Sequence, residues 1–431
     1  MEETSNQREE LEIGEQNYST IKQKKQHIKD NSQIRYRRVS TLMMIIGLIG
    51  IAITVINYIN NKSNILLGAK NEREIVLLSD IGGTNCRLKL VEMSGKKGDE
   101  MKEIESKVLK PWNYKNIEEL LVDFLRPFKN TKNYPKYAIL GIPGAITGNT
   151  MHELVNVENW PETDGDKLAE KLGIKELHFI NDFVIIGYGI QSDLKEGEDY
   201  IVLKNKDKLN DKEKKFIIGP GTGLGVCYLI KNENKKYYNV YGSEGSHQDF
   251  APRDQFQLNY MNFVQKYFNN IKHVSAETAC AGPSIVPMYQ YLYLNNSEGA
   301  LKSLSDRVLK LKSTDNPDEL NNVNFDIVQS GLDKSDKVAR RVLEFFVELL
   351  GHISGNMGVY TLPYGGIYIV GGLSKTIREI FQTEIFQKAL LSRGEQNNLL
   401  DKMPIVLVLN DQLGMLGAIE YARILIDNKL N

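Results

Sequence analysis

The feature that most constrains this chain is a pair of glycine-rich turns, each placed between two predicted strands. The first turn, residues 80–85, has an apolar strand pattern at 75–80 before it and an alternating pattern at 87–92 after it. The second turn, residues 219–225, divides two strands predicted within 216–230. Glycines at a tight turn let backbone N–H groups converge on an anion. The sequence therefore predicts two separate phosphate-binding hairpins, one in each half of the globular part.

Neither turn matches the common nucleotide motifs. The second turn lacks the Gly-Lys-Ser/Thr ending of a Walker loop, and residues 224–229 continue as a strand where a dinucleotide fingerprint needs a helix. Considered alone, the first turn is explained about equally well as an ordinary hairpin. A third glycine cluster, residues 365–372, ends a buried strand, and a close strand–helix contact explains it about as well.

Strand and helix patterns alternate along the rest of the chain, which predicts an α/β fold. We expect further strands at 137–144, 177–182, 367–372 and 405–409, and helices at 117–128 and 342–360. The polar stretches 191–215 and 293–337 are expected to hold looped insertions.

Composition excludes two classes of protein. Lys plus Arg (54) and Asp plus Glu (55) nearly cancel, so no basic excess indicates a nucleic-acid partner. The three cysteines, Cys86, Cys227 and Cys280, are far apart and form no Cys-x-x-Cys pair. We therefore expect free thiols that are buried or half-buried, and neither a disulfide framework nor a zinc knuckle.

Several acidic residues stand where they could act on a small polar ligand. Asp182 ends the strand at 177–182, a position suited to a carboxylate that takes the proton of an attacking hydroxyl, although capping the next helix is an alternative role. Glu244 and His247 are three residues apart and could reach one sugar, but a surface ion pair or a metal site would give the same pattern. Glu277 fits a sugar ligand or a helix's first turn.

Taken together and in this order, the motifs resemble those of the bacterial-type glucokinase family, from about residue 75 to 423. They include Ser-Asp-Ile-Gly-Gly-Thr-Asn at 79–85, Ile-Asn-Asp-Phe at 180–183, Ser-Glu-Gly-Ser-His at 243–247 and Gly-Gly-Ile-Tyr-Ile-Val-Gly-Gly at 365–372. The resemblance implies a two-lobed, actin-like ATPase (ribonuclease H-like) fold with ATP and sugar in the cleft between the lobes. It implies a small lobe at 72–191, completed by 415–431, and a large lobe at 192–414.

The resemblance also implies a role for each matching residue. Asp182 would be the catalytic base, and Asp80 would hold Mg²⁺ through water. The sugar ligands would be Asn181, Asp182, Glu244, His247, Glu277 and Asn156. The ATP ligands would be Asp80, Gly82, Gly83, Thr84, Asn85, Gly219, Gly221, Thr222, Gly223, Gly225, Gly371 and Gly372.

Two positions depart from the family pattern. Ser246 stands where the family usually has a second glycine, and a positive φ there would strain a serine. The stretch around Asn156 is one residue longer than the family's Thr-Asn-x-x-Trp, so the role of Asn156 in sugar binding depends on how that stretch folds.

The N-terminal part lies outside this resemblance. Residues 1–39 are polar, which predicts a disordered tail. Residues 40–59 form an apolar segment long enough to cross a bilayer as a helix; a cleaved signal peptide and a buried core helix fit less well, because a long polar tail precedes the segment and it is apolar all round. Basic residues are denser before the segment than after it, at Lys24, Lys25, Lys29, Arg35, Arg37 and Arg38 against Lys62, Lys70 and Arg73.

That charge bias favours a cytosolic tail and a translocated C-terminal part, whereas a kinase needs cytosolic ATP. We expect a single-pass membrane protein whose catalytic part faces the cytosol, for example on the outer membrane of an organelle.

The expected activity is ATP-dependent phosphorylation of glucose to glucose 6-phosphate, the first step of glycolysis, with ATP and Mg²⁺ as cofactors. Two alternatives remain open from the sequence: a membrane-tethered sugar sensor of the same fold, and a kinase for another hexose. Glucose, ATP and a membrane are the expected partners, and a homodimer is left open.

Overall fold

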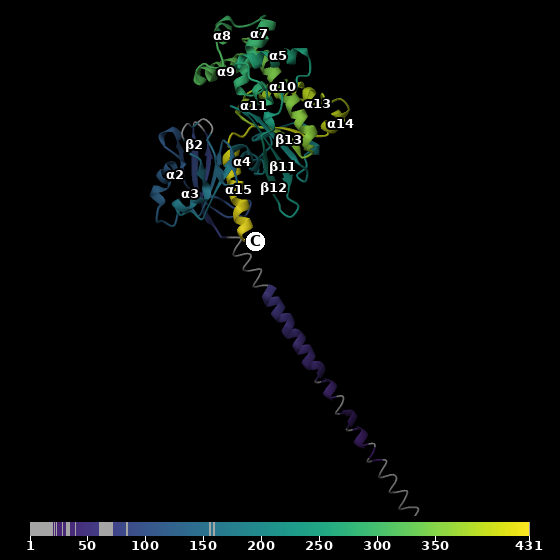
Figure 1. The fold of residues 1–431 in the computed structure, drawn as a ribbon. Coiled ribbons are helices and arrows are strands. Elements are labelled where there is room, and N and C mark those ends of the chain that lie inside the picture. The colour runs from purple at the N-terminus through teal and green to yellow at the C-terminus, as the bar shows by residue number, and fades with distance from the viewer. Residues whose placement is uncertain are drawn as a thin grey trace, which may run out of the picture. The chain divides into compact units, whose positions relative to one another are not determined.

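The structure is a computed structural model that describes residues 20, 22, 24–27, 29–31, 35–38, 40–59, 72–82, 85–154, 157 and 160–430. Gly83, Thr84 and Asn156 therefore lie outside the described residues. The chain divides into two compact units, of which one spans Glu72–Lys429 and carries both predicted hairpins. Figure 1 shows two sheets within this unit, with helices packed on them.

The first sheet has five strands in the order β3-β2-β1-β4-β8. They are β1 (Glu74–Ile81), β2 (Cys86–Met93), β3 (Lys102–Leu109), β4 (Tyr137–Ile142) and β8 (Glu176–Asn181). β1 and β2 form the predicted antiparallel hairpin, with Asp80 opposite Arg87. β4 and β8 extend the sheet in parallel, and α2 (Ile117–Leu125) and α3 (Gly165–Leu172) make the connections that parallel strands need.

The second sheet has six strands in the order β12-β11-β10-β13-β14-β9. They are β9 (Tyr200–Lys204), β10 (Lys215–Pro220), β11 (Leu224–Lys231), β12 (Tyr238–Ser243), β13 (Gly366–Ile369) and β14 (Ile405–Val408). β10 and β11 form the second predicted hairpin, in which Gly219 lies opposite Gly225. Every residue of β10, β13 and β14 is buried, which explains their continuous apolar runs.

Helices of the second half build the largest apolar core. The expected helix at 342–360 is α10 (Lys337–Thr361), which packs against α13 (Ile385–Leu391), α7 (Ile285–Asn295) and α9 (Pro317–Leu332). α5 (Gln255–Tyr267) and α8 (Lys302–Val308) lie around α7. The remaining short elements are β5 (Ile146–Thr147), β6 (Thr150–Met151), β7 (Thr163–Asp164), α6 (Ala276–Ala279), α11 (Gly372–Thr376), α12 (Arg378–Phe381), α14 (Asn397–Leu400), η1 (Pro111–Asn113), η2 (Arg126–Phe128), η3 (Lys206–Lys208), η4 (Gly245–His247), η5 (Gly282–Ser284) and η6 (Gly394–Gln396).

The expectation of looped insertions at 191–215 and 293–337 is wrong. The first stretch contains the edge strand β9, and the second contains α8 and α9. α9 has the helix-start features that polarity concealed, because Asn316 caps it and Pro317 occupies its first turn. Its buried side chains, including Val323 and Ile327, recur at helical spacing and face α7 and α10.

Two helices join the sheets. α4 (Asp182–Gly189) leaves the first sheet directly after β8 and lies against β11 and β12 of the second. α15 (Leu413–Leu430) runs beside α4 (Figure 1), so close that a Cβ on Gly417 would lie 1.7 Å from the carbonyl oxygen of Ile185. Both sheets are thus connected through residues adjacent to the predicted catalytic carboxylate.

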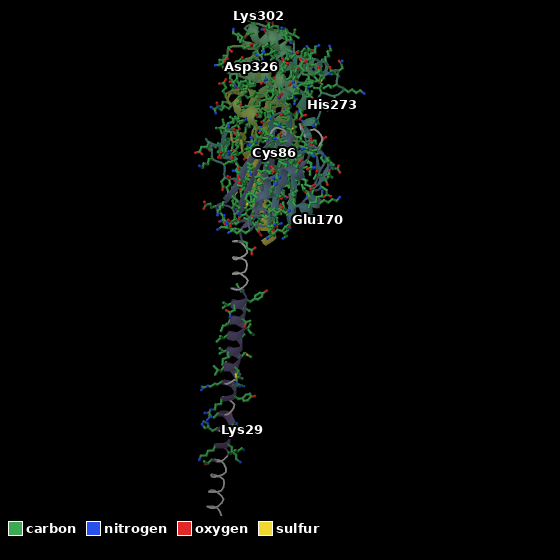
Figure 2. All side chains as sticks on the ribbon, turned by 90° about the vertical axis from the view of Figure 1, so that its left-hand side faces the viewer. Lys29, Cys86, Glu170, His273, Lys302 and Asp326 are labelled. Carbon is green, nitrogen blue, oxygen red and sulfur yellow. The ribbon has the colours of Figure 1, made fainter. Side chains whose placement is uncertain are left out.

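The predicted membrane segment is helical. Within the described residues, one helix, Lys24–Ile59, is long and apolar enough to cross a membrane, and none of its apolar window is buried. Its large apolar side chains are exposed in the part of the chain that the structure describes, as Figure 2 shows. The described positions from 20 to 38 are also helical and exposed, whereas the sequence predicts no regular structure there.

The three cysteines are free and buried, which confirms the prediction for them. Cys86 lies inside the body of the unit (Figure 2). Burial and the nearby Asp80 carboxylate raise the pKa of the Cys86 thiol to about 12, so this thiol is protonated and unreactive near neutral pH.

Candidate active site

Asp182 occupies the first turn of α4, immediately after β8. The helix cap is the neighbouring Asn181, whose side-chain oxygen accepts the N–H groups of Phe183 at 3.0 Å and Val184 at 3.2 Å. The capping role that the sequence allowed for Asp182 thus belongs to Asn181. Asp182 keeps one oxygen on the N–H of Phe183, at 2.9 Å. This arrangement fixes the start of α4 and leaves the Asp182 carboxylate at the end of the strand.

The electrostatic surroundings of Asp182 favour a carboxylate that binds protons near neutral pH. Burial raises its pKa to about 6, and the negative charges of Asp80 and Glu244 act in the same direction. The N–H of Phe183 opposes this effect by stabilising the charged form. Asp80 comes from the first hairpin and Glu244 from the end of β12, so these interactions bring three of the predicted site residues together.

The first hairpin places Asp80 beside two groups that the sequence did not single out. The guanidinium of Arg87 lies 3.5 Å from the Asp80 carboxylate. Gly414, next to the start of α15, leaves no room for a side chain, because its Cβ would lie 2.9 Å from the Asp80 carboxyl carbon. Burial raises the pKa of Asp80, and Arg87 partly offsets this. The N–H of Gly82 donates to the carbonyl of Asn85 at 2.8 Å, which closes the turn.

The second hairpin is closely packed on both sides. Its turn is closed by the N–H of Gly221 donating to the carbonyl of Gly223 at 2.7 Å. Gly225 lies against the ring of Phe183, which would be 2.0 Å from a Cβ at that position. The N–H of Gly282 donates to the carbonyl of Gly221 at 2.8 Å. The hairpin is therefore held by the residue that follows Asp182 and by the segment that follows Glu277.

The third glycine cluster approaches the second hairpin. Gly371 has φ +99°, which favours glycine, and a Cβ there would lie 3.0 Å from the carbonyl oxygen of Pro220. Gly372 begins α11 and lines a pocket of about 750 Å³. The other lining residues are Leu332, Lys375, Thr376, Arg378, Glu379 and Asp411. Lys375 and Asp411 form an ion pair across this pocket.

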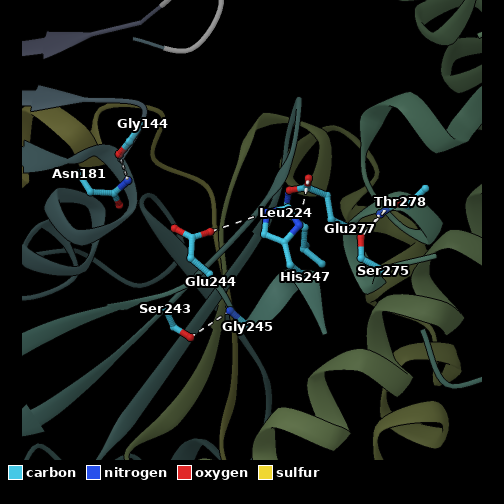
Figure 3. A network of polar contacts seen from close by, with 10 residues as sticks. All are labelled: Gly144, Asn181, Leu224, Ser243, Glu244, Gly245, His247, Ser275, Glu277 and Thr278. Atoms are coloured by element: carbon cyan, nitrogen blue, oxygen red, sulfur yellow. Dashed lines mark hydrogen bonds and ion pairs between the residues drawn. The ribbon is translucent and has the colours of Figure 1, made fainter. Parts of the chain in front are cut away.

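Two of the predicted sugar ligands, Glu244 and Glu277, lie beside the imidazole of a third, His247, as Figure 3 shows. His247 lies with Nε2 3.7 Å from a Glu244 oxygen and Nδ1 4.0 Å from a Glu277 oxygen. The other Glu277 oxygen accepts the N–H of Leu224, at 2.7 Å, from the second hairpin. Side-chain donors and acceptors therefore converge from η4 and α6, a set that suits adjacent hydroxyl groups.

Ser246 is accommodated without backbone strain. It lies in the single 3₁₀ turn η4 and is 3% exposed, and it is not one of the residues with positive φ. The concern that a serine strains this turn therefore does not apply. In the same region, the side-chain amide of Asn181 donates to the carbonyl oxygen of Gly144 at 3.4 Å (Figure 3).

The structure thus brings Asp80, Asn181, Asp182, Glu244, His247 and Glu277 to one region together with both hairpins and the Gly371 turn. Of the predicted residues, Gly83, Thr84 and Asn156 are outside the described part of the chain. Sequence reasoning missed Arg87, Phe183 and Leu224. Phe183 lies within the Ile-Asn-Asp-Phe motif and Arg87 lies two residues after the first turn, so both could have been singled out, whereas the role of Leu224 rests on a backbone N–H that carries no sequence signal.

Comparison with known proteins identifies the family to which the chain is similar. The family model described as Glucokinase matches residues 77–424. A glucokinase of Nostoc punctiforme is 31% identical over 345 residues, which cover 80% of this chain and 97% of that protein.

Solved structures share the fold. The glucokinase of Balamuthia mandrillaris in complex with glucose has a TM-score of 0.62 at 15% identity and covers 84% of this chain and 99% of its own. A ROK-family glucokinase of Streptomyces griseus, in complex with glucose and AMPPNP, has a TM-score of 0.51 at 16% identity, covering 81% and 99%. The fold is therefore the mixed α/β fold of sugar kinases.

Proposed function

This chain belongs to the glucokinase family, and on that premise we propose how its own residues carry out the ATP-dependent phosphorylation of glucose. The observation that carries the proposal is the position of Asp182, a half-buried carboxylate in the first turn of α4, directly after β8, whose pKa is raised to about 6 by burial, with the negative charges of Asp80 and Glu244 acting in the same direction. Asp80 belongs to the first hairpin and Glu244 is a predicted sugar ligand, so charges from both groups act on the Asp182 carboxylate.

Asp182 is the general base of the reaction. As the 6-hydroxyl oxygen of glucose forms its bond to the γ-phosphorus of ATP, the bond from that phosphorus to the β–γ bridging oxygen breaks and ADP leaves. The hydroxyl proton passes to Asp182. A pKa of about 6 leaves this carboxylate mostly ionised at neutral pH and still basic enough to accept a proton. Glucose 6-phosphate is the product.

The sugar is held by Asn181, Glu244, His247 and Glu277. Glu244 and Glu277 flank the His247 ring at 3.7 and 4.0 Å, so each carboxylate can accept from one hydroxyl while the imidazole serves a neighbouring one. Several polar groups on adjacent hydroxyls discriminate well, because a sugar that lacks one hydroxyl leaves its partner unpaired once lobe closure has excluded water from the site. The site therefore favours glucose. Binding of a hexose that differs from glucose in one hydroxyl group depends on how well that group matches these ligands.

ATP lies along the two hairpins, with its phosphates on the backbone of residues 80–85 and 219–225. The pocket of about 750 Å³ beside Gly372 takes the adenosine, because it adjoins the Gly371 turn that lies against Pro220. In this arrangement, residues 72–191 completed by 415–431 form the small lobe, and residues 192–414 form the large lobe. Closing of the lobes around both ligands excludes water and limits ATP hydrolysis.

The residues present fit a magnesium ion that is held mainly by the nucleotide. No group of three metal-ligating side chains occurs among the described residues, so an all-protein cage is not available there. Mg²⁺ commonly keeps several waters and uses one or two carboxylates together with substrate phosphates. Asp80 is such a carboxylate at the first hairpin. When bound, the ion neutralises charge on the β- and γ-phosphates.

A coupled assay for glucose 6-phosphate tests this function, with the full chain in detergent and with residues 70–431, which contain the compact unit Glu72–Lys429. Glucose-dependent ADP release is expected from both. Glucose binding without turnover would favour the sugar sensor, and a panel with mannose and glucosamine tests the choice of hexose.

We also propose that the helix containing residues 40–59 anchors the enzyme in a membrane with the catalytic unit in the cytosol. Support comes from its length, its apolar composition and the full exposure of its apolar window among the described residues. Carbonate extraction of membranes tests the anchor: the full chain stays in the pellet, and residues 70–431 are released. Full release of the intact chain would refute a spanning helix.

A further inference from the structure

Lys110 is a basic residue that lies beside the first hairpin, although it follows a different strand of the sheet. It directly follows β3, the edge strand, and its ammonium group donates to the side-chain oxygen of Asn85 at 2.6 Å. Leu109 pairs with Cys86, so Lys110 lies opposite Asn85 at the point where the hairpin turn ends. The sheet register thus places an amine beside the predicted phosphate loop.

Lys110 also lies on the face of the sheet that carries Asp80. The Cys86 side chain is fully buried in the apolar core of the first sheet, and Leu109 packs against that core. Because side chains alternate between the two faces, Asn85 and Lys110 belong to the opposite face. On that face Arg87 contacts Asp80 at 3.5 Å.

The charge of Lys110 has no acidic partner among the described residues. Arg87 forms an ion pair with Asp80, and Lys89 forms one with Glu103 at 2.8 Å. No described carboxylate lies within ion-pair distance of Lys110. Its ammonium instead bonds a neutral amide and lies 5.3 Å from the centre of the Trp112 ring. An exposed amine without a carboxylate at ion-pair distance is free to contact an incoming anion.

We propose that Lys110 binds the terminal phosphate of ATP and stabilises the charge that its oxygens carry during transfer. The proposal rests on the function assigned above to the first hairpin. In phosphoryl transfer, fixed cations at the equatorial oxygens supply much of the stabilisation. Asn85 holds the ammonium in place before the nucleotide arrives, and the phosphate then takes over the contact. Lys110 is thereby a substrate-binding residue contributed by the small lobe.

Steady-state kinetics of Lys110→Ala, Lys110→Gln and Lys110→Arg test the proposal. Loss of a charged hydrogen bond predicts that kcat/KM for ATP falls about 10- to 100-fold in the Ala and Gln variants. Lys110→Arg should restore part of the lost kcat/KM for ATP. Lys107→Ala is the matched control, because Lys107 is on the same strand but lies over the Phe124 ring, and its kinetics stay as in the wild type. Unchanged kinetics in Lys110→Ala would overturn the proposal.

A binding measurement separates phosphate recognition from a structural effect on Asn85. Calorimetry should show that Lys110→Ala weakens AMPPNP about 10-fold or more and leaves ADP, which has no terminal phosphate, nearly unchanged. Equal weakening of both nucleotides would mean that the variant only disturbs the hairpin. A wild-type enzyme without glucose-dependent turnover would count against the proposed function instead, so the two failures are distinguishable.

Discussion

The backbone N–H of Leu224 donates to the carboxylate of Glu277 at 2.7 Å, and this bond joins a proposed sugar ligand to the second glycine-rich hairpin. The contact leaves no room for a side chain between them, since a Cβ on Gly223 would lie 2.6 Å from the same oxygen. The other Glu277 oxygen faces His247 (Figure 3). Glu277 therefore links the proposed sugar site to the proposed ATP site.

Glu277→Gln should weaken the binding of both glucose and ATP. The amide keeps an acceptor but loses the charge, so we expect the KM for glucose to rise about 10- to 100-fold and the KM for ATP to rise severalfold. His247→Ala is the control, because His247 makes no bond to the hairpin, and it should raise the KM for glucose alone. Steady-state kinetics with each substrate varied distinguish them. If the KM for ATP in Glu277→Gln is unchanged, as it should be in His247→Ala, then Glu277 does not influence the hairpin.

Asp182→Asn should lower kcat about 100-fold or more and leave glucose binding nearly unchanged, because the amide keeps the shape of the side chain and cannot accept the proton. Calorimetry with glucose and the coupled assay measure the two quantities. Asp193→Asn, at a side chain that is 77% exposed, serves as the control and should keep full activity. Wild-type turnover in Asp182→Asn would assign the base elsewhere.

Activity should fall on the acid side of neutrality. The pKa of Asp182 is raised to about 6 and its carboxylate form is the active one, so kcat/KM for glucose should decrease about tenfold per pH unit below that value. Removing the nearby negative charge in Glu244→Gln stabilises the Asp182 carboxylate and should move the midpoint to lower pH. A pH series of initial rates measures both. A flat profile from pH 5 to pH 7 would contradict the assignment.

The same raised pKa has a consequence for stability with the opposite sign. Asp182 binds its proton more tightly in the folded chain than in the unfolded chain, where its pKa is near 3.8. Its contribution to the free energy of unfolding is therefore most favourable below pH 4 and is lost as the pH rises through about 6. The ionised form that catalysis needs is the less stable one.

Features that depend on one strand or one turn could be predicted from the sequence. The strands that flank both hairpins, and the position of Asp182 at the end of β8, follow from apolar runs that end in glycine or an acid. The contacts between distant segments could not be predicted in the same way. The bond from Leu224 to Glu277 uses a backbone N–H, which has no signal in the sequence. The cap of α4 is Asn181, although asparagine and aspartate cap helices about equally well, so the sequence could not decide between Asn181 and Asp182.

Gly225→Ala tests whether the second hairpin depends on its contact with Phe183. The new methyl group would lie 2.0 Å from the Phe183 ring, so the ring or the strand must move. We expect a loss of about 1–3 kcal/mol in the free energy of unfolding, the usual effect of overpacking, together with reduced turnover because Phe183 follows Asp182. Gly221→Ala is the matched control in the same hairpin, since nothing lies within 4 Å of its Cβ. Denaturant unfolding measures both variants, and equal stabilities would show that the contact with Phe183 does not constrain the hairpin.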